Sequence, residues 1–310
     1  MSAITLNNIT KTYNKGSILA VDDVSFSVEK GEVFGLIGPD GAGKSTIFRM
    51  LTTLLVADKG TATVGGYDVV KDYKTIRTIV GYMPGRFSLY QDLTVEENLN
   101  FFATVFSTTI EENYDLIKDI YVQLEPFKDR RAGKLSGGMK QKLALCCALI
   151  HKPEVLFLDE PTTGVDVVSR KEFWEMLKRL KEQGITILVS TSYMDEATLC
   201  DRIGLILNGK VLSIATPENT IQAYPEKLYA VKSKSMYKLL NDLRSFQGTI
   251  NCYTFGEYLH LSISCSEEDV KKYLNEKGYN DFVFKPTTPT VEDCFIRLLK
   301  TENGNGNKDK

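Results

Sequence analysis

The chain has few of the residues that build structural metal sites. Its 310 residues include two histidines, His151 and His260, and six cysteines, none of which forms a Cys-x-x-Cys pair or a cluster with histidine. Structural zinc sites need such ligands at close spacing, and disulfide frameworks belong mainly to small secreted chains. The sequence therefore predicts no zinc site and reduced thiols that are buried or incidental.

Long apolar runs and blocks of like charge are also missing. The most apolar segments, 155–158 and 185–189, are far shorter than the roughly 20 residues that a membrane-spanning helix needs. Lysine and arginine number 38 against 40 aspartates and glutamates, a formal net charge of -2, which indicates no nucleic-acid-binding arm. Residues 1–10 lack the basic start and apolar block of a secretory signal, so a cytoplasmic protein is expected.

Short apolar runs alternate with helical patterns over the first two thirds of the chain. Three runs of strand length predict buried strands at 32–37, 155–158 and 185–189. Helical patterns predict helices after Lys44, over 139–150 and from Ser169 to Gly184. Ser169 and Glu172 fit a capping box at the start of the last helix. This alternation predicts an α/β fold with a mainly parallel sheet, which binds ligands at the carboxyl ends of its strands.

The character of the sequence changes after Pro217. Asn208-Gly209 predicts a closing hairpin before this point. Beyond it, strands are expected at 228–231 and 282–284, a hairpin over 250–263, and helices over 236–246, 267–277 and 291–300. This order predicts a small α+β, ferredoxin-like domain. The expected domains are residues 1–220, with a helical subdomain at about 83–152, residues 221–300, and a disordered tail over 301–310.

A glycine-rich segment lies between the first predicted strand and its helix. Residues 38–45 read GPDGAGKS, which fits the P-loop pattern in the required context. The glycines let several amide hydrogens face one anion, and the helix adds its positive N-terminal dipole. Lys44 is expected to reach the β- and γ-phosphates of ATP, and Ser45 to bind Mg²⁺. A glycine-rich turn with a surface lysine is the alternative.

An acidic pair follows the predicted strand at 155–158. Asp159 is positioned to bind the magnesium shell, and Glu160 to orient and deprotonate an attacking water. A helix cap or a solvated turn is the alternative interpretation of such a pair. Beside a P-loop, the pair predicts a nucleotide-hydrolysing site with Glu160 and Lys44 as catalytic residues.

Residues 135–141, LSGGMKQ, resemble the signature motif of ABC ATPases. Ser136 and the two glycines that follow it form an amide-rich start of a helix, for which an ordinary helix cap is the alternative. In that family the signature of one subunit contacts the γ-phosphate held by the P-loop of another. The resemblance therefore implies a second ATPase subunit, in a homodimer or a heterodimer, with ATP in the interface.

Further segments resemble the same family. Tyr13 stands where an aromatic residue stacks on adenine, although core packing is the alternative, and residues 164–166 match the loop that links the two sites. Residues 82–95 resemble the entry to the helical subdomain, which touches the membrane subunit, and residues 290–295 the end of ABC-2-type exporter ATPases. The resemblance is specific through Thr216 and weak beyond it.

The resemblance implies a P-loop NTPase of the ABC ATPase type that couples MgATP hydrolysis to transport, with export favoured. Its partners would be integral membrane permease subunits, which would hold it at the inner face of the cell membrane. The residues expected on the nucleotide are Tyr13, Gly38, Pro39, Asp40, Gly41, Ala42, Gly43, Lys44, Ser45, Thr46, Ser136, Gly137 and Gly138, with Ser45 and Asp159 on the metal.

Three positions depart from the family pattern. Gly85 replaces the usual glutamine that reaches the metal and the attacking water, and Ser192 replaces the switch histidine that contacts the γ-phosphate. Losing one such donor costs on the order of a hundredfold in rate. Asp40, where asparagine is common, is the mildest departure.

These departures leave a second interpretation open, a mainly regulatory subunit with weak hydrolysis in a heterodimeric transporter. A third class, the soluble ABC proteins of translation or DNA repair, usually has tandem ATPase domains, long coiled coils or basic arms. The sequence has none of these features, so no nucleic-acid partner is expected.

Overall fold

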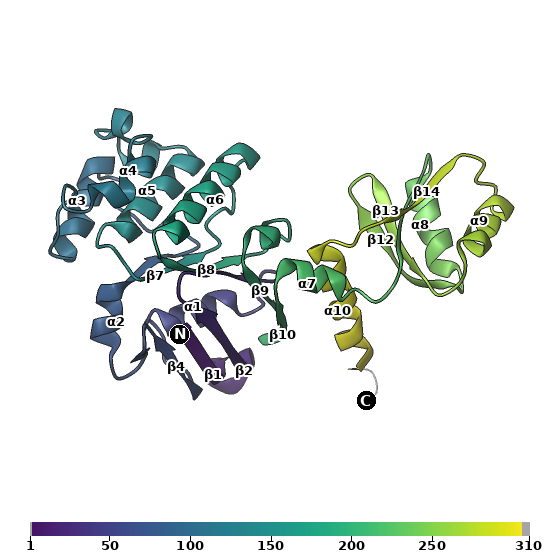
Figure 1. The fold of residues 1–310 in the computed structure, drawn as a ribbon, viewed down its shortest axis with the longest axis horizontal. Coiled ribbons are helices and arrows are strands. Elements are labelled where there is room, and N and C mark those ends of the chain that lie inside the picture. Colours follow the sequence, from purple (N-terminus) through teal and green to yellow (C-terminus); the bar gives the residue numbers. More distant parts are fainter. Residues whose placement is uncertain (1, 306–310) are drawn as a thin grey trace. The chain divides into compact units, whose positions relative to one another are not determined.

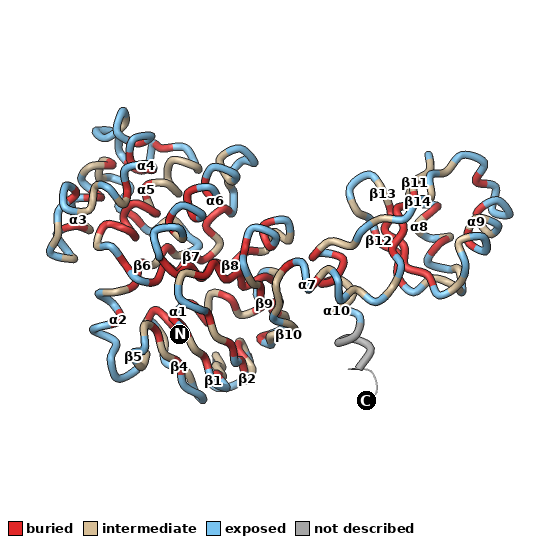
Figure 2. Tube along the Cα trace, in the orientation of Figure 1, coloured by how far each residue is buried: buried red, intermediate tan, exposed pale blue. Residues whose placement is uncertain are grey.

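The computed structural model describes residues 2–305, with side chains as far as residue 300. The chain divides into two compact units, residues 1–217 and 218–310. Figure 1 shows the order of the elements and Figure 2 the burial of each residue. In the described residues, no helix is both long and apolar enough to cross a membrane.

A six-stranded sheet forms the centre of the first unit. Its strand order is β10 (Lys210–Ala215), β9 (Arg202–Leu207), β3 (Val33–Ile37), β8 (Thr186–Thr191), β7 (Val155–Asp159) and β6 (Val80–Met83). All neighbouring pairs are parallel except β9 and β10, which form the predicted hairpin. Every residue of β3, β7 and β8 is buried, which is why these strands read as continuous apolar runs. The predicted mainly parallel sheet is confirmed.

A second, antiparallel sheet lies in the same unit and had no counterpart in the sequence prediction. Its order is β2 (Ile18–Glu29), β1 (Ser2–Tyr13), β4 (Lys59–Val64) and β5 (Tyr67–Asp68). The pairing of β1 with β2 shifts register at four places, which interrupts the alternation of apolar and polar residues that identifies a strand. Ile4, Val21 and Phe26 from this sheet join Phe34 of β3 in one buried core.

Helices lie on both sides of the six-stranded sheet (Figure 1). Helix α1 (Lys44–Leu51) contacts β7 as well as β2 and β4, so it lies between the two sheets. The remaining helices of this unit are α2 (Tyr73–Ile79), α3 (Val95–Val105), α4 (Tyr114–Tyr121), α5 (Gly137–Leu149) and α6 (Val167–Glu182), with 3-10 turns at Asn14–Gly16, Glu125–Phe127, Ala132–Lys134 and Glu196–Leu199. Helices α3 and α4 both pack on α5, within the range predicted for the helical subdomain.

The start of α6 corrects the sequence prediction. Asp166, not Ser169, is its N-cap, and the Asp166 carboxylate accepts hydrogen bonds from the amides of Val168 and Ser169 at 3.1 and 3.0 Å. The capping box of Ser169 and Glu172 is therefore wrong. The helix begins almost one turn earlier, so Ser169 supplies an amide that needs a cap instead of the capping side chain.

The second unit contains one four-stranded antiparallel sheet. After α7 (Pro217–Gln222), which crosses the boundary, come β11 (Leu228–Ser233), α8 (Met236–Ser245), β12 (Thr249–Phe255), β13 (Tyr258–Ile263), α9 (Glu267–Glu276), β14 (Phe282–Thr287) and α10 (Val291–Asn305). The sheet order is β12, β13, β11, β14. These elements occur in the predicted order. Helix α10 continues past the predicted end at Lys300, and residues 306–310 of the expected tail lie outside the described residues.

Candidate functional site

The loop from Gly38 to Gly43, called the phosphate loop after its predicted role, follows β3. Backbone atoms enclose it on two sides. A Cβ atom at Gly38 would lie 2.2 Å from the carbonyl oxygen of Ile206, and one at Gly43 would lie 2.4 Å from that of Ala20. Gly43 also has a φ of 105°, in the left-handed region that favours glycine. Because Gly43 offers no side chain to cap α1, the first amides of this helix are available to an anion.

Lys44 lies under this loop, almost completely buried. Its Nζ donates to the carbonyl oxygens of Gly38 at 2.7 Å and Pro39 at 2.9 Å, and lies 3.0 Å from Oε1 of Glu160. An ammonium group has three N–H donors, so these three acceptors occupy all of them. A phosphate bound in the loop would have to replace at least one of these acceptors to contact Lys44.

Asp159 and Glu160 come at the carboxyl end of β7, next to β8. Asp159 is 4% exposed, and its Oδ1 accepts a hydrogen bond from Ser190 of β8 at 2.7 Å. Burial, with a smaller contribution from the negative charge of Asp159, raises the pKa of neighbouring Tyr82 to about 12. Glu160 has a φ of 50°, which is uncommon for a residue with a side chain. Thr163 donates to its second carboxylate oxygen at 3.2 Å.

Tyr13 lies at the end of β1, half-buried and next to the first turn of α1. Its hydroxyl oxygen is 3.4 Å from Oγ1 of Thr46. The structure therefore brings Tyr13 beside the helix that follows the phosphate loop, which is compatible with contact to a base. Ser45 is half-buried in the same turn, and Asp40 is exposed on the loop. The roles of these residues stay predictions.

The signature segment lies at the start of a different helix, α5. Ser136 is its N-cap and accepts a hydrogen bond from the amide of Met139 at 3.3 Å, so the alternative of an ordinary helix cap also holds within this chain. A Cβ atom at Gly138 would lie 2.8 Å from Oγ of Ser169, because α5 and α6 approach closely here. Among the described residues no hydrogen bond joins Ser136 to the phosphate loop.

Gly85 and Ser192, two of the three departures from the family pattern, both lie in the first unit, and Gly85 lies beside the acidic pair. Gly85 is exposed, and a Cβ atom built there would lie 3.1 Å from the carbonyl oxygen of Asp159 and 3.9 Å from its carboxyl carbon. A side chain at this position would therefore start beside the expected metal-binding carboxylate. Ser192 follows directly after β8, two residues beyond Ser190.

A buried carboxylate near Ser192 has no counterpart in the predicted site. Glu196 is 3% exposed and accepts hydrogen bonds from Thr162 and Thr191, both at 2.7 Å. Arg170 of α6 lies 3.9 Å from the same carboxylate. This network joins the segment after the acidic pair to the end of β8 and to α6. In the sequence, Glu196 is one acidic residue of the segment 193–197 that follows Ser192, and no local pattern there predicts a buried network.

The donor set suits magnesium triphosphate. Ser45 offers a hydroxyl and Asp159 a carboxylate, and Mg²⁺ prefers such oxygen ligands together with phosphate oxygens and water. In residues 2–305, no group of three or more His, Cys, Asp or Glu side chains could hold a metal. A magnesium ion held by Ser45 and Asp159 would complete its coordination with phosphate oxygens and water.

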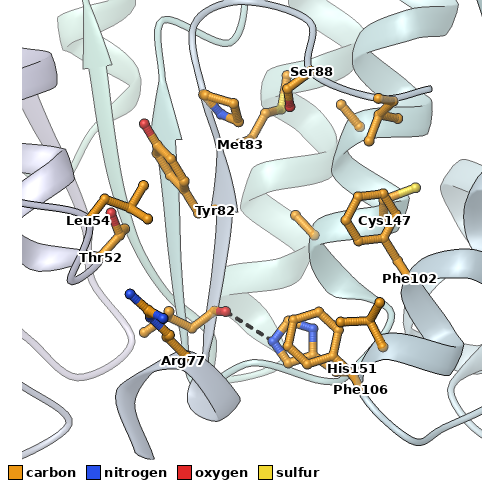
Figure 3. Close-up of a pocket in the computed structure, with 16 residues that line it drawn as sticks. Thr52, Leu54, Arg77, Tyr82, Met83, Ser88, Phe102, Phe106, Cys147 and His151 are labelled. Atoms are coloured by element: carbon orange, nitrogen blue, oxygen red, sulfur yellow. Dashed lines mark hydrogen bonds between the residues drawn. The ribbon is translucent and has the colours of Figure 1, made fainter. Parts of the chain in front are cut away.

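A separate apolar groove opens between α3, α5 and the end of β6, with a volume of about 440 Å³ (Figure 3). Phe102 and Cys147 line it from the helices, and Tyr82 from the strand. His151 stacks on Phe106 with ring centroids 3.7 Å apart, and its Nε2 lies 3.0 Å from the Val80 carbonyl oxygen. Burial lowers the pKa of His151, and the bond to Val80 opposes that shift.

Comparison with known proteins gives a consistent picture. Residues 21–163 match the family model described as ABC transporter. The chain is 39% identical over 304 residues to a probable multidrug ABC transporter ATP-binding protein, YbhF, of Escherichia coli (strain K12), covering 96% of this chain and 52% of that protein. The chain thus spans about half the length of that relative.

Two other similarities extend over nearly whole chains of the compared proteins. The Nod factor export ATP-binding protein I of Rhizobium sp. (strain N33) is 36% identical over 304 residues, covering 97% of this chain and 98% of that protein. A dimeric bacterial ABC transporter cassette of known structure is 27% identical, with a TM-score of 0.62, covering 69% of this chain and 98% of that chain.

Proposed function

This chain belongs to the family of ABC transporter ATP-binding proteins, and we propose that it binds and hydrolyses MgATP to drive export through separate membrane subunits. The observation that carries the proposal is the 3.0 Å contact between Lys44 and Glu160. It joins a phosphate loop to an acidic pair, the two parts that ATP hydrolysis requires.

Each residue of the site has a distinct role in this proposal. The amides of the loop and the start of α1 would bind the β- and γ-phosphates, with Lys44 as the counter-charge. Ser45 and Asp159 would hold the magnesium ion. When bound, this ion would neutralise part of the negative charge of the phosphates. Glu160 would accept a proton from the attacking water once its Oε1 no longer contacts Lys44, because a carboxylate oxygen must be available to act as a base.

A second ATPase subunit would complete the site. Ser136 and Gly137 are exposed, as are Val167 and Val168 at 72% and 69%. Two adjacent, highly exposed valines directly after the loop at 164–166 indicate a surface that a partner subunit covers. Similarity to a dimeric cassette supports this proposal.

The apolar groove of Figure 3 is the proposed contact with a membrane permease subunit. It is lined mainly by apolar side chains and includes Tyr82 and Met83, which lead to Gly85 beside Asp159. A permease segment seated there would lie along the strand that ends near the acidic pair. Such a contact would hold the chain at the inner face of the cell membrane.

A mainly regulatory subunit with weak hydrolysis is the second candidate. Gly85 and Ser192 favour it, because both lack the side chain that would assist the water or the γ-phosphate. The two candidates differ in what happens after Lys44→Ala in this chain and after the same change in a partner subunit. Equal loss of transport-coupled ATP turnover from both changes would contradict a regulatory role.

The first experiment is calorimetry of MgATP binding to the purified full-length chain, with Lys44→Ala as the test and Lys142→Ala as the control. Lys142 belongs to α5 and pairs with Glu172 at 2.7 Å, away from the phosphate loop. Binding that is lost with Lys44→Ala and kept with Lys142→Ala is expected. Absence of magnesium-dependent binding by the wild type would overturn the proposed function. Identification of a membrane protein that copurifies in mild detergent tests the permease partner.

A further inference from the structure

Ser190 of β8 contacts both members of the acidic pair through one hydroxyl group. The oxygen donates to Oδ1 of Asp159 at 2.7 Å and accepts from the amide of Glu160 at 3.0 Å. We infer that Ser190 is a positioning residue for MgATP binding and hydrolysis, an inference that rests on the proposed function. It would act through Asp159 and Glu160 and not by touching the nucleotide.

The hydrogen-bond partners of Ser190 separate this role from ordinary packing. The residues before Ser190 are Ile187, Leu188 and Val189, all fully buried, and Ser190 is also 0% exposed. An apolar residue suits such a strand, because a parallel strand is covered on both faces. A buried hydroxyl is favourable only when its hydrogen bonds are made, and here both are made to the acidic pair.

On the Asp159 side, the bond orients the carboxylate. Asp159 and Ser190 are paired residues in the parallel register of β7 and β8, so their side chains are held by two rigid strands. The bond uses Oδ1, and within the described part of the chain Oδ2 of Asp159 accepts no hydrogen bond. The geometry therefore leaves one oxygen of Asp159 for the magnesium shell and fixes its direction.

On the Glu160 side, the bond supports an unfavourable backbone conformation. Glu160 has a φ of 50°, which costs free energy for any residue with a side chain unless its surroundings hold it. Its amide donates to the Ser190 carbonyl oxygen at 3.1 Å as well as to the hydroxyl. Ser190 thus stabilises the turn that brings the Glu160 carboxylate beside Lys44.

The experiment measures affinity for a fluorescent ATP analogue with Mg²⁺ and with EDTA, in the full-length chain. The variants are Ser190→Ala, Ser190→Cys, which nearly keeps the size of serine, and Ser262→Ala as the control. Ser262 is 1% exposed in the second unit and bonds Tyr224, so its loss removes an equally buried hydroxyl away from the site. Thermal melting verifies that each variant is folded.

The gain in affinity on adding Mg²⁺ is expected to fall about tenfold in Ser190→Ala and Ser190→Cys, because each loses a strong bond to a charged carboxylate. Affinity in EDTA and the behaviour of Ser262→Ala should stay as in the wild type. If Ser190→Ala does not fold, the magnesium-dependent gain in affinity of Ser190→Cys tests the inference instead. An unchanged magnesium gain, or an equal loss with and without Mg²⁺, would overturn the role of Ser190. Failure of the wild type to bind would instead overturn the proposed function.

Discussion

Lys44 and Glu160 lie 3.0 Å apart, so the cation of the phosphate loop is paired with the proposed base. The two residues belong to different strand-loop segments, after β3 and after β7, and β8 separates those strands in the sheet. The pair keeps the carboxylate of Glu160 directed at the loop where phosphates would bind. The ion pair therefore positions both side chains, in addition to the chemical role proposed for each.

Replacing Glu160 by glutamine removes the base but keeps the shape of the side chain. We expect Glu160→Gln to bind MgATP and to lower phosphate release on the order of a hundredfold or more, the usual contribution of a general base. An ATP-bound dimer should also persist longer, as measured by size-exclusion chromatography. Glu172→Gln on α6, which pairs with Lys142, is the control. A wild-type rate in Glu160→Gln would remove Glu160 from the role of base.

Replacing Gly43 by alanine tests the enclosure of the phosphate loop. A Cβ atom there would lie 2.4 Å from the Ala20 carbonyl oxygen. The alanine would also have to adopt a φ of 105°. Gly16, with a φ of 93° and nothing within 4 Å of its Cβ position, is the matched control. Gly16→Ala should cost only backbone strain, about 1 kcal/mol of unfolding free energy. Gly43→Ala should cost more and lose nucleotide binding; similar unfolding curves for both variants would contradict the packing described here.

Restoring the family side chains at Ser192 and Gly85 tests whether these two departures limit the rate of ATP hydrolysis. Ser192→His is expected to raise ATP turnover by about tenfold or more, because a donor aimed at developing charge on phosphate lowers the barrier. Gly85→Gln should add to this effect, provided Asp159 yields slightly at the 3.1 Å contact. Steady-state phosphate release measures both. Unchanged turnover in the single and double variants would mean that another step limits the reaction.

Glu196 is expected to be important for stability. Glu196→Ala leaves the hydroxyls of Thr162 and Thr191 without their buried acceptor and removes the buried one of the two carboxylates near Arg170. We expect a loss of about 3 kcal/mol in unfolding free energy, measured by urea denaturation. Glu175→Ala, at an exposed position of α6, should change stability by less than about 0.5 kcal/mol. Equal effects would show that the buried network contributes nothing.

His151 should make the first unit less stable in mild acid. Burial lowers the pKa of His151 in the folded protein, so the unfolded chain binds a proton more readily. The contribution of the neutral imidazole to stability is therefore present above the unfolded pKa of about 6.5 and is lost as the pH falls below that value. The unfolding free energy of wild type minus that of His151→Gln is therefore expected to decrease between about pH 7 and pH 5.5. A difference independent of pH would contradict the burial of a neutral imidazole.

The buried parallel strands and the phosphate loop could be predicted because their signals are local. β3, β7 and β8 are covered on both faces, so each is a continuous apolar run, and the loop needs glycines at fixed spacing. The sheet of β1, β2 and β4 was missed because its register shifts hide the alternation. The start of α6 was misplaced because Asp166 and Ser169 are both good capping residues, and only one of them receives the amides.

The sequence by itself was enough to predict triphosphate chemistry for this protein, since the prediction needs only the glycine spacing, Lys44 and an acidic pair after a buried strand. Only the tertiary structure decided which side chains hold that site in place. Asp159 and Ser190 are 31 residues apart in the chain and meet because β7 and β8 pair in parallel with those two residues in register. Contacts of this kind depend on strand register, which no local pattern of residues encodes.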